Sequence, residues 1–316
     1  MRCAGGSAMG GLDCAGSAGP ARLRGLDCAG SAGRVILLAV SGGRPFDIAG
    51  RGGELPGPRW RRAVPPIEAA LAAGLPVRPV WINEVGGRTF EVGEGAGRYF
   101  LKWTPAGSGI DLGREVARLR WAVRFTPVPV VLAQGSNAAG SWIVTAALAG
   151  ENAVADRWLT DPGPAVIAIG TGLRALHDAL PVPGCPFSWS AEDRVADARR
   201  RAAELDPASW HPAHRGLSVD QALAALDRPP AVDRLVVCHG DSCAPNTLLD
   251  TEGGWTGHVD LGSLGVGDRW ADLAVATWST EWNYGPGWSD RLLAAYGIDA
   301  DPVRMAYYRL LWDLGP

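Results

Sequence analysis

Lysine is almost absent from this sequence. Of its 30 lysine and arginine residues, 29 are arginine, and Lys102 is the single lysine. A lysine is a compact point charge on a flexible stem, which suits a phosphate in a confined site. The simpler alternative is an ordinary surface lysine on a strand, so the neighbours of Lys102 must decide between the two.

Long apolar runs and regularly spaced cysteines are also missing. No run approaches the ~20 residues that cross a bilayer, and the apolar stretch 35–40 is shorter than a signal-peptide core. We therefore expect a cytoplasmic protein that does not bind membranes. The 6 cysteines lack disulfide-framework spacing. Cys238 and Cys243 are a lone pair, from which we do not expect a zinc site.

Charge is distributed unevenly along the chain. Residues 1–150 hold 17 basic and 10 acidic residues, whereas residues 151–316 hold 13 and 23, which gives net charges of +7 and −10. An acidic half attracts a cationic partner and disfavours nucleic acid, whose backbone carries the same sign. An ordinary solvated acidic surface remains the alternative.

Residues 1–60 have the composition of a low-complexity extension. The octapeptide Leu-Asp-Cys-Ala-Gly-Ser-Ala-Gly occurs at 12–19 and again at 26–33, within sequence rich in glycine and alanine. Such sequence buries too little apolar surface to offset the entropy of ordering. We expect this stretch to be disordered and assign it no function.

Residues 78–150 predict a small antiparallel sheet with one helix. Glycine-bearing turns separate short alternating segments. The expected strands are 77–85, 88–92, 99–103, 128–133 and 141–147, and the expected helix is 112–125.

Residues 151–316 predict a mostly helical lobe. We expect helices at 165–180, 193–205 (exposed), 218–226, 270–278 and 289–296, and a short buried strand at 235–238. The predicted fold class is therefore α+β, with two lobes.

The central motif follows the strand at 235–238. His-Gly-Asp ends at Asp241, Asn246 comes five residues later, and a second aspartate, Asp260, follows another short apolar segment. This order resembles the catalytic loop and the metal-binding aspartate of kinases. The chemistry requires these residue types: a carboxylate orients the acceptor hydroxyl, while amide and carboxylate oxygens are ligands that Mg²⁺ prefers.

A longer stretch extends this resemblance. Residues 237–272 contain Cys-His-Gly-Asp, Pro-Asn, Val-Asp-Leu-Gly, Leu-Gly-Val and Asp-Arg-Trp-Ala-Asp-Leu-Ala in order, and they are similar to the aminoglycoside 3′-phosphotransferase family. The similarity covers roughly 78–316, through Ala-Leu-His at 175–177, Cys-Pro-Phe at 185–187 and Tyr-Tyr-Arg-Leu-Leu at 307–311. It implies a bilobal protein-kinase-like fold and ATP-dependent phosphorylation of an aminoglycoside hydroxyl, the 3′ one, as a resistance activity.

The resemblance implies roles for four residues of the larger lobe. Asp241 is the catalytic base or the carboxylate that orients the acceptor, and Asn246 and Asp260 bind Mg²⁺. His239 is expected to orient the loop and not to act as an acid or base.

It also implies the nucleotide contacts of the smaller lobe. Lys102 contacts the α- and β-phosphates of ATP, and Glu115, on the next helix, pairs with it. Gly86 and Gly87 form a turn over the phosphates, although a glycine pair between strands is also typical of a plain hairpin turn.

The acceptor is expected to be a cationic small molecule bound by the acidic lobe. The candidate contacts are Glu281, Asp313 and Trp282, and further acidic residues available for ammonium groups are Glu192, Asp193 and Asp197. Among the remaining tryptophans, Trp270, Trp278 and Trp288 are expected mostly in the core. Asp268 and Asp272 could be further metal ligands, but structural hydrogen bonding is the favoured role. We expect a monomer or weak dimer.

The sequence departs from the family at two places. Ser263 stands where the family usually has arginine, for which the nearby Arg269 is a possible substitute, and the chain after Asp313 lacks a terminal aromatic residue. Two alternatives therefore stay open. The acceptor could be a macrolide, an amino sugar or a choline-like alcohol. The chain could also be a nucleotide-binding pseudokinase, which Ser263 favours and the intact Lys102 and Asp241 disfavour.

Overall fold

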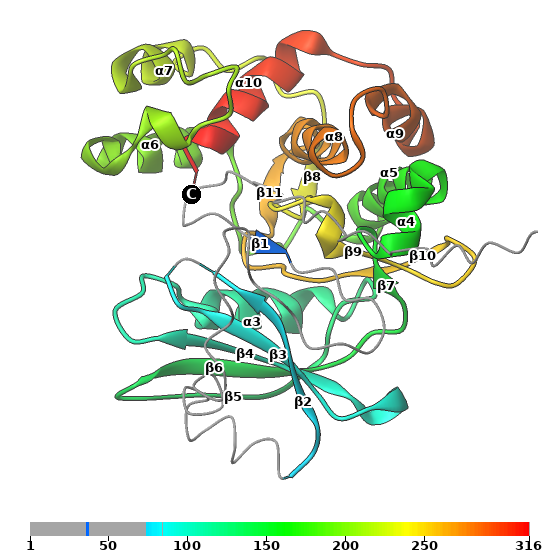
Figure 1. Ribbon diagram of the computed structural model, residues 1–316. Coiled ribbons are helices and arrows are strands. Elements are labelled where there is room, and N and C mark those ends of the chain that lie inside the picture. Colours follow the sequence, from blue (N-terminus) through cyan, green and yellow to red (C-terminus); the bar gives the residue numbers. More distant parts are fainter. Residues whose placement is uncertain (1–35, 38–73, 84, 316) are drawn as a thin grey trace, which may run out of the picture.

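The computed structural model describes residues 36–37, 74–83 and 85–315. These described residues form an antiparallel sheet with one helix and a larger, mostly helical part (Figure 1). The expected α+β fold with two lobes is confirmed. The extension expected at 1–60 lies outside the described residues except for Ile36–Leu37 (β1), and its expected disorder stays a prediction. The lobe boundaries at 78–150 and 151–316 stay predictions.

The smaller lobe is built on a single sheet with strand order β1-β2-β3-β4-β6-β5, all neighbours antiparallel. Its further elements are β2 (Val77–Ile82), β3 (Arg88–Val92), the 3-10 turn η1 (Gly95–Gly97), β4 (Tyr99–Pro105), α3 (Leu112–Ala122), β5 (Val131–Asn137) and β6 (Gly140–Ala146).

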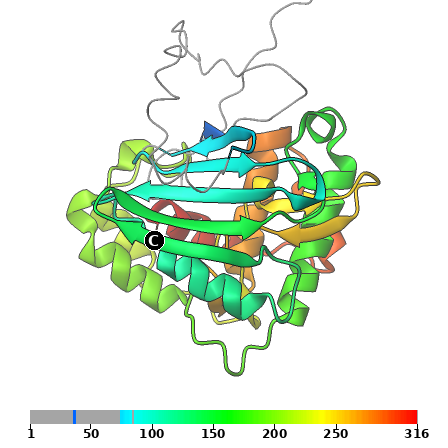
Figure 2. The ribbon, with the colours of Figure 1, turned by 90° about the horizontal axis from the view of Figure 1, so that it is seen from below.

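Helix α3 lies between this sheet and the larger lobe, as Figures 1 and 2 show from two directions. It begins at the N-cap Asp111, whose carboxylate accepts from the Gly113 amide. Its residues Leu112 and Val116 are buried against Ile143 of β6, as the helical spacing of apolar residues requires. Other residues of α3, Leu119 and Trp121, belong to the core cluster of the larger lobe, and Glu115 is buried near the lobe interface.

The larger lobe begins with β7 (Glu151–Asn152) and contains most of the helices. They are α4 (Asp156–Thr160), α5 (Pro162–Ala179), α6 (Ala191–Arg200), α7 (Val219–Ala225), α8 (Trp270–Tyr284), α9 (Ser289–Tyr296) and α10 (Pro302–Asp313), with 3-10 turns η2 (Ala202–Glu204), η3 (Pro207–Ser209) and η4 (Ala244–Asn246). Its other strands are β8 (Leu235–Cys238), β9 (Thr247–Leu249), β10 (Trp255–His258) and β11 (Gly265–Asp268). Within the described ranges, no helix is long and apolar enough to cross a bilayer.

Two short ladders in this lobe position the central motif. Strand β8 pairs antiparallel with β11, with Cys238 opposite Gly265. Strands β9 and β10 form an antiparallel hairpin in which Thr247 is opposite His258. The residue before β9 and the residues after β10 therefore emerge at the same end of the hairpin.

Some predicted elements differ from the observed ones. The helix expected to be exposed at 193–205 is α6, and it buries Arg194, Val195 and Ala198 in the core, because its apolar residues recur on one face. The strand expected at 128–133 begins only at Val131, since prolines at 127 and 129 have no amide to donate to a ladder. Helix α10 was not predicted.

Candidate active site

The loop at residues 239–246 and the segment after β10 are held together by a backbone bond. The Val259 amide donates to the carbonyl of Asn246 over 3.0 Å. This bond places Asn246 and Asp260, the two predicted metal ligands, on adjacent segments. The sequence predicted their chemistry, and the β9–β10 hairpin brings them together.

Asp272 at the start of α8 anchors the same loop. Its carboxylate accepts from the amides of His239 (2.6 Å) and Gly240 (2.9 Å) and lies 2.9 Å from Nε2 of His177. Burial alone would raise the pKa of Asp272, but the hydrogen bond and charge interaction with His177 hold the pKa below its usual value. Asp272 thus binds backbone groups, which confirms the structural role expected for it.

Asp268 is structural in the same way. Its two carboxylate oxygens accept from the amides of Trp270 (3.0 Å) and Asp233 (2.8 Å). Arg269, the suggested substitute for the missing family arginine, pairs with Asp233 over 2.6 Å. Its guanidinium is therefore held by Asp233 and is not free to take the place of that arginine.

His239 joins the loop to the metal-binding segment through both ring nitrogens. Nδ1 accepts from the Asp241 amide over 3.2 Å, so in the neutral ring Nε2 carries the proton and donates to the Val259 carbonyl over 3.0 Å. The side chain is fully buried. With both nitrogens engaged by backbone groups, His239 orients the loop and has no nitrogen left for proton transfer.

Asp241 presents a carboxylate oxygen that is free to take a new partner. Its Oδ1 is buried and has no hydrogen-bond partner among the described residues. Burial and the negative charge of Asp260 raise the pKa of this carboxyl. A carboxylate with a raised pKa and an unused oxygen is well suited to accept a proton from a substrate hydroxyl.

Asn246 and Asp260 offer the oxygen atoms that Mg²⁺ prefers. The Asn246 amide nitrogen donates to the Asp241 carbonyl over 2.9 Å, which leaves Oδ1 available. Asp260 has a left-handed backbone (φ 62°) and a side chain that is 39% exposed. The described residues contain no group of three or more His, Cys, Asp or Glu side chains placed to hold a metal. Mg²⁺ needs no such cage, because it is usually held by one or two carboxylates together with waters and substrate phosphates.

Lys102 lies between the two lobes and contacts Glu115, its predicted partner, and also Asp260, which was predicted only as a metal ligand. Its Nζ is 2.8 Å from Oε2 of Glu115 and 2.9 Å from Oδ1 of Asp260. Burial would lower the pKa of Lys102, but these two carboxylates raise it above the ordinary value, so the ammonium stays charged. The only lysine of the chain is therefore not an ordinary surface lysine.

Gly86 and Gly87 form the turn between β2 and β3. Gly86 has φ +84°, and the Gly87 amide donates to Oδ1 of Asn83 over 2.5 Å. A Cβ at Gly87 would come within 2.6 Å of the Asn83 amide nitrogen. The turn ends at Arg88, which pairs with Trp103, one position from Lys102. Asn83 was missed by the sequence reasoning, although asparagine before a glycine pair is typical of such turns.

The three predicted acceptor contacts gather around a residue that the sequence analysis missed, His211. Its ring centre is 6.4 Å from that of Trp282, and its backbone amide donates to Oδ2 of Asp313 over 3.2 Å. Glu281 lies close enough to influence the His211 charge. No motif marks His211, because its position depends on how a loop packs on α8 and α10.

The Asp313 side chain is completely buried, and Oδ2 lies 2.5 Å from Nδ1 of His214. Glu281 remains partly exposed but bonds to Arg309 (3.3 Å) and to the hydroxyl of Ser289 (3.2 Å). Asp197 on α6 is likewise paired with arginines. Packing of α10 against the loop at 211–214 buries the Asp313 carboxylate, which disfavours Asp313 as an acceptor contact, and its role there stays a prediction.

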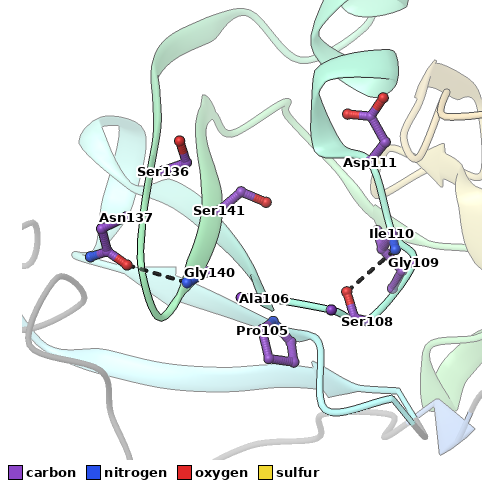
Figure 3. Close-up of a pocket in the computed structure, with 11 residues that line it drawn as sticks. Pro105, Ala106, Ser108, Gly109, Ile110, Asp111, Ser136, Asn137, Gly140 and Ser141 are labelled. Carbon is purple, nitrogen blue, oxygen red and sulfur yellow. Dashed lines mark hydrogen bonds between the residues drawn. The ribbon is translucent and has the colours of Figure 1, made fainter.

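A hollow lies in the smaller lobe, separate from the residues described above. It has a volume of about 300 Å³ and lies between the loop from β4 to α3 and the β5–β6 hairpin (Figure 3). Its polar atoms mostly serve local turns, as when Oδ1 of Asn137 accepts from the Gly140 amide and the Ser108 hydroxyl from the Ile110 amide. None of the predicted site residues lines it, so we assign it no part in the chemistry.

Comparisons with known proteins agree with this site. The model of the "Phosphotransferase enzyme family" matches residues 77–308. An aminoglycoside 3′-phosphotransferase of Streptomyces fradiae is 41% identical over 219 residues, which are 66% of this chain and 81% of that protein.

Two solved structures share the fold. An aminoglycoside 3′-phosphotransferase of type VIII is 32% identical with a TM-score of 0.67, covering 78% of this chain and 97% of that one. An aminoglycoside phosphotransferase of Streptomyces rimosus, solved with ADP and streptomycin, is 28% identical with a TM-score of 0.61, covering 78% and 96%.

The fold and site thus define a phosphotransferase with a protein-kinase-like architecture. The chain belongs to the phosphotransferase enzyme family, and its resemblance to the aminoglycoside 3′-phosphotransferases, expected from residues 237–272, is confirmed.

Proposed function

We propose that this protein transfers the γ-phosphate of ATP to the 3′-hydroxyl of an aminoglycoside and thereby confers resistance. The observation that carries the proposal is the joint placement of Lys102, Glu115 and Asp260 beside Asp241 with its free oxygen. The similarity to aminoglycoside 3′-phosphotransferases supports the choice of acceptor.

The roles of the residues follow from their contacts. Asp241 accepts the proton of the acceptor hydroxyl while that oxygen attacks the phosphate, so no covalent enzyme intermediate is required. Lys102 donates to the α- and β-phosphates, and Glu115 holds it in position. The turn at Gly86 and Gly87 lies over the phosphates.

Asn246 and Asp260 are the residues that would hold Mg²⁺. When bound with the nucleotide, the cation neutralises charge on the phosphate oxygens. The bond from Asn246 Nδ2 to the Asp241 carbonyl fixes the amide so that Oδ1 is the available ligand. Asp260 contributes the carboxylate oxygen that Lys102 does not occupy.

A second candidate keeps the chemistry and changes the acceptor hydroxyl. The Streptomyces rimosus relative was solved with streptomycin. The burial of Asp313 also disfavours one acidic contact expected for an acceptor phosphorylated on its 3′-hydroxyl. Streptomycin, a macrolide, an amino sugar or a choline-like alcohol are therefore the acceptors to compare. A pseudokinase is disfavoured because Lys102, Glu115, Asp241, Asn246 and Asp260 are all present.

An ADP-release assay with Mg-ATP tests the proposal. Kanamycin, neomycin, streptomycin, a macrolide and choline are compared, with Asp241→Ala as the control. We expect turnover on kanamycin or neomycin that is lost in the variant, and ³¹P and ¹H NMR of the product should place the phosphate on the 3′ oxygen. Turnover only on streptomycin would favour the second candidate. If the protein binds ATP but releases no ADP with any aminoglycoside, the acceptor assignment is overturned.

Two further expectations stay predictions. A monomer or weak dimer is tested by light scattering of the full chain. Resistance is tested by growth of a susceptible host that carries the gene, in the presence of the antibiotic that the enzyme phosphorylates. The Asp241→Ala gene is the control. We expect growth only with the intact gene.

A further inference from the structure

Three aromatic rings lie in a row beside the catalytic loop. The His211 ring centre lies 4.1 Å from that of Trp278, and the planes are tilted by 39°. Trp282, one helical turn further along α8, is 5.4 Å from Trp278. We call His211, Trp278 and Trp282 the aromatic wall. Trp278 is buried, whereas His211 and Trp282 are partly exposed and offer their surfaces to a ligand.

The wall is attached to the loop that carries Asp241. Cys243, two residues after Asp241, packs in one buried cluster with Trp278, and Trp282 packs against that cluster. The Ala244 amide donates over 2.8 Å to the hydroxyl of Ser279, the neighbour of Trp278. A molecule whose hydroxyl reaches Asp241 is therefore close to the wall.

The imidazole of His211 has a defined tautomer when neutral. Its Nδ1 accepts from the Ala213 amide over 3.2 Å, so the proton is on Nε2. Among the residues that the structure describes, Nε2 has no hydrogen-bond partner. In the neutral ring Nε2 is thus a hydrogen-bond donor, and it cannot accept a bond from an ammonium group.

The carboxylates around the wall already have cationic or hydroxyl partners. Asp313 is buried against His214, and Glu281 bonds to Arg309, whose guanidinium lies 5.2 Å from the Trp278 ring centre. The wall therefore presents aromatic faces and one N–H donor, while Glu281 is engaged through Oε1 and Asp313 is buried against His214. Such a surface suits the C–H face and the oxygens of a sugar ring.

We propose that the aromatic wall binds the C–H face of a sugar ring of the acceptor, with Nε2–H of His211 donating to a hydroxyl or ether oxygen of that ring. His211 is then a specificity-determining residue of the acceptor site. This inference rests on the proposed function, since it names how that same site selects its acceptor.

The proposal implies a dependence on pH. The groups that face His211 are Asp313 and Arg309 from α10, Glu281 from α8 and His214 from its own loop. Burial, and after it His214 and Arg309, lower the pKa of His211, against the opposing effects of Asp313 and Glu281. The ring therefore stays neutral at neutral pH.

Protonation at acid pH has two consequences for the wall. Nδ1 then carries a proton and no longer accepts from Ala213, which loosens the loop. The ring also gains a positive charge beside Arg309, which repels a cationic acceptor. The KM for the acceptor is therefore expected to rise as the pH falls.

The test compares the full-length protein with His211→Phe, which keeps an aromatic face and removes the donor and the titration. With an aminoglycoside that the wild type phosphorylates, we expect the acceptor KM to rise about 3–10-fold, the value of one hydrogen bond. The KM for ATP and kcat should change less than about twofold, and the acid rise in acceptor KM should disappear. Trp288→Phe, an aromatic exchange outside the wall, is the matched control and should leave the acceptor KM unchanged.

Trp282→Leu provides a second variant in case His211→Phe does not fold, and it should raise the acceptor KM in the same way. If both variants are folded and keep the acceptor KM and its pH dependence of the wild type, the inference is overturned while the proposed function stands. If the wild type itself phosphorylates no aminoglycoside, the proposed function fails first and the inference falls with it.

Discussion

Nε of Arg118 donates to the carbonyl of Leu264 over 2.7 Å, and the guanidinium lies 4.7 Å from the ring centre of Phe187. Arg118 is one helical turn after Glu115 on α3, and Leu264 follows Asp260 by four residues. A buried cation of the smaller lobe thus holds a carbonyl of the larger lobe, next to the segment that carries Asp260. This bond sets the position of Glu115 relative to Asp260, and both contact Lys102.

Replacing Arg118 by methionine should therefore reduce kcat more than it changes the acceptor KM. A hydrogen bond from a charged group contributes about 1.5–3 kcal/mol, so we expect a loss of about tenfold or more in kcat/KM for ATP. Arg120→Met, the same change at an exposed position of the same helix, is the control. Steady-state kinetics of both variants give the result, and equal effects of the two substitutions would contradict this role of Arg118.

Lys102 and Glu115 should behave as one unit. Lys102→Met removes the donor to the nucleotide and leaves two carboxylates, Glu115 and Asp260, without their shared cation. Because Glu115 acts through Lys102, Glu115→Gln should lower kcat/KM for ATP in the wild type but add little to Lys102→Met. A double-mutant cycle measures this coupling. Additive losses would show that Glu115 acts independently of Lys102.

Gly240 should tolerate no side chain. It has φ +84°, and a Cβ there would lie against the carbonyl of Ser263, well inside van der Waals contact. Backbone strain and overpacking each cost about 1–3 kcal/mol. Gly240→Ala is thus expected to lower the free energy of unfolding by about 2 kcal/mol or more and to abolish turnover. In Gly216→Ala the new Cβ meets open space, and urea unfolding should detect no loss there.

His258 should make stability depend on pH. It is buried, and neither ring nitrogen has a hydrogen-bond partner within the described part of the chain. Burial holds the pKa of His258 well below its usual value of 6.5. Below about pH 6.5 the unfolded chain binds a proton that the folded protein does not. The free energy of unfolding is therefore not reduced by His258 titration above about pH 6.5, and it decreases as the pH falls below that value.

His258→Phe removes both this titration and the unsatisfied nitrogens. We expect the variant to be more stable than the wild type by about 1 kcal/mol at neutral pH and by more at pH 5.5. Urea unfolding at the two pH values measures the difference. A wild type and variant with the same pH dependence would argue that His258 is satisfied or solvated in the folded state.

Local sequence was sufficient for elements with strong boundary signals. The strand at 88–92, the strand at 235–238 and the helix at 289–296 have the predicted bounds, because turn residues or a change of hydrophobic period mark both ends. The ends of α6 and β5 were predicted less well. For α6, the packing of one helix face on the core decides which residues are buried. For β5, the prolines at 127 and 129 cannot donate to a strand ladder, so the strand begins only at Val131.

The sequence by itself determined the chemistry of the site. Asp241, Asn246 and Asp260 lie within 20 residues of one another, so their order along a strand, a loop and a hairpin carries the information. The single lysine pointed to the proposed phosphate contact by its residue type alone.

Only the tertiary structure decided which distant groups meet. Lys102 and Asp260 are 158 positions apart, yet the lobes bring their side chains to 2.9 Å. Asp313 is buried by His214, and His211 lies on Trp278, because the loop at 211–214 packs between α8 and α10. Such contacts depend on the packing of elements that are far apart in the chain, and no local pattern of residue types encodes them.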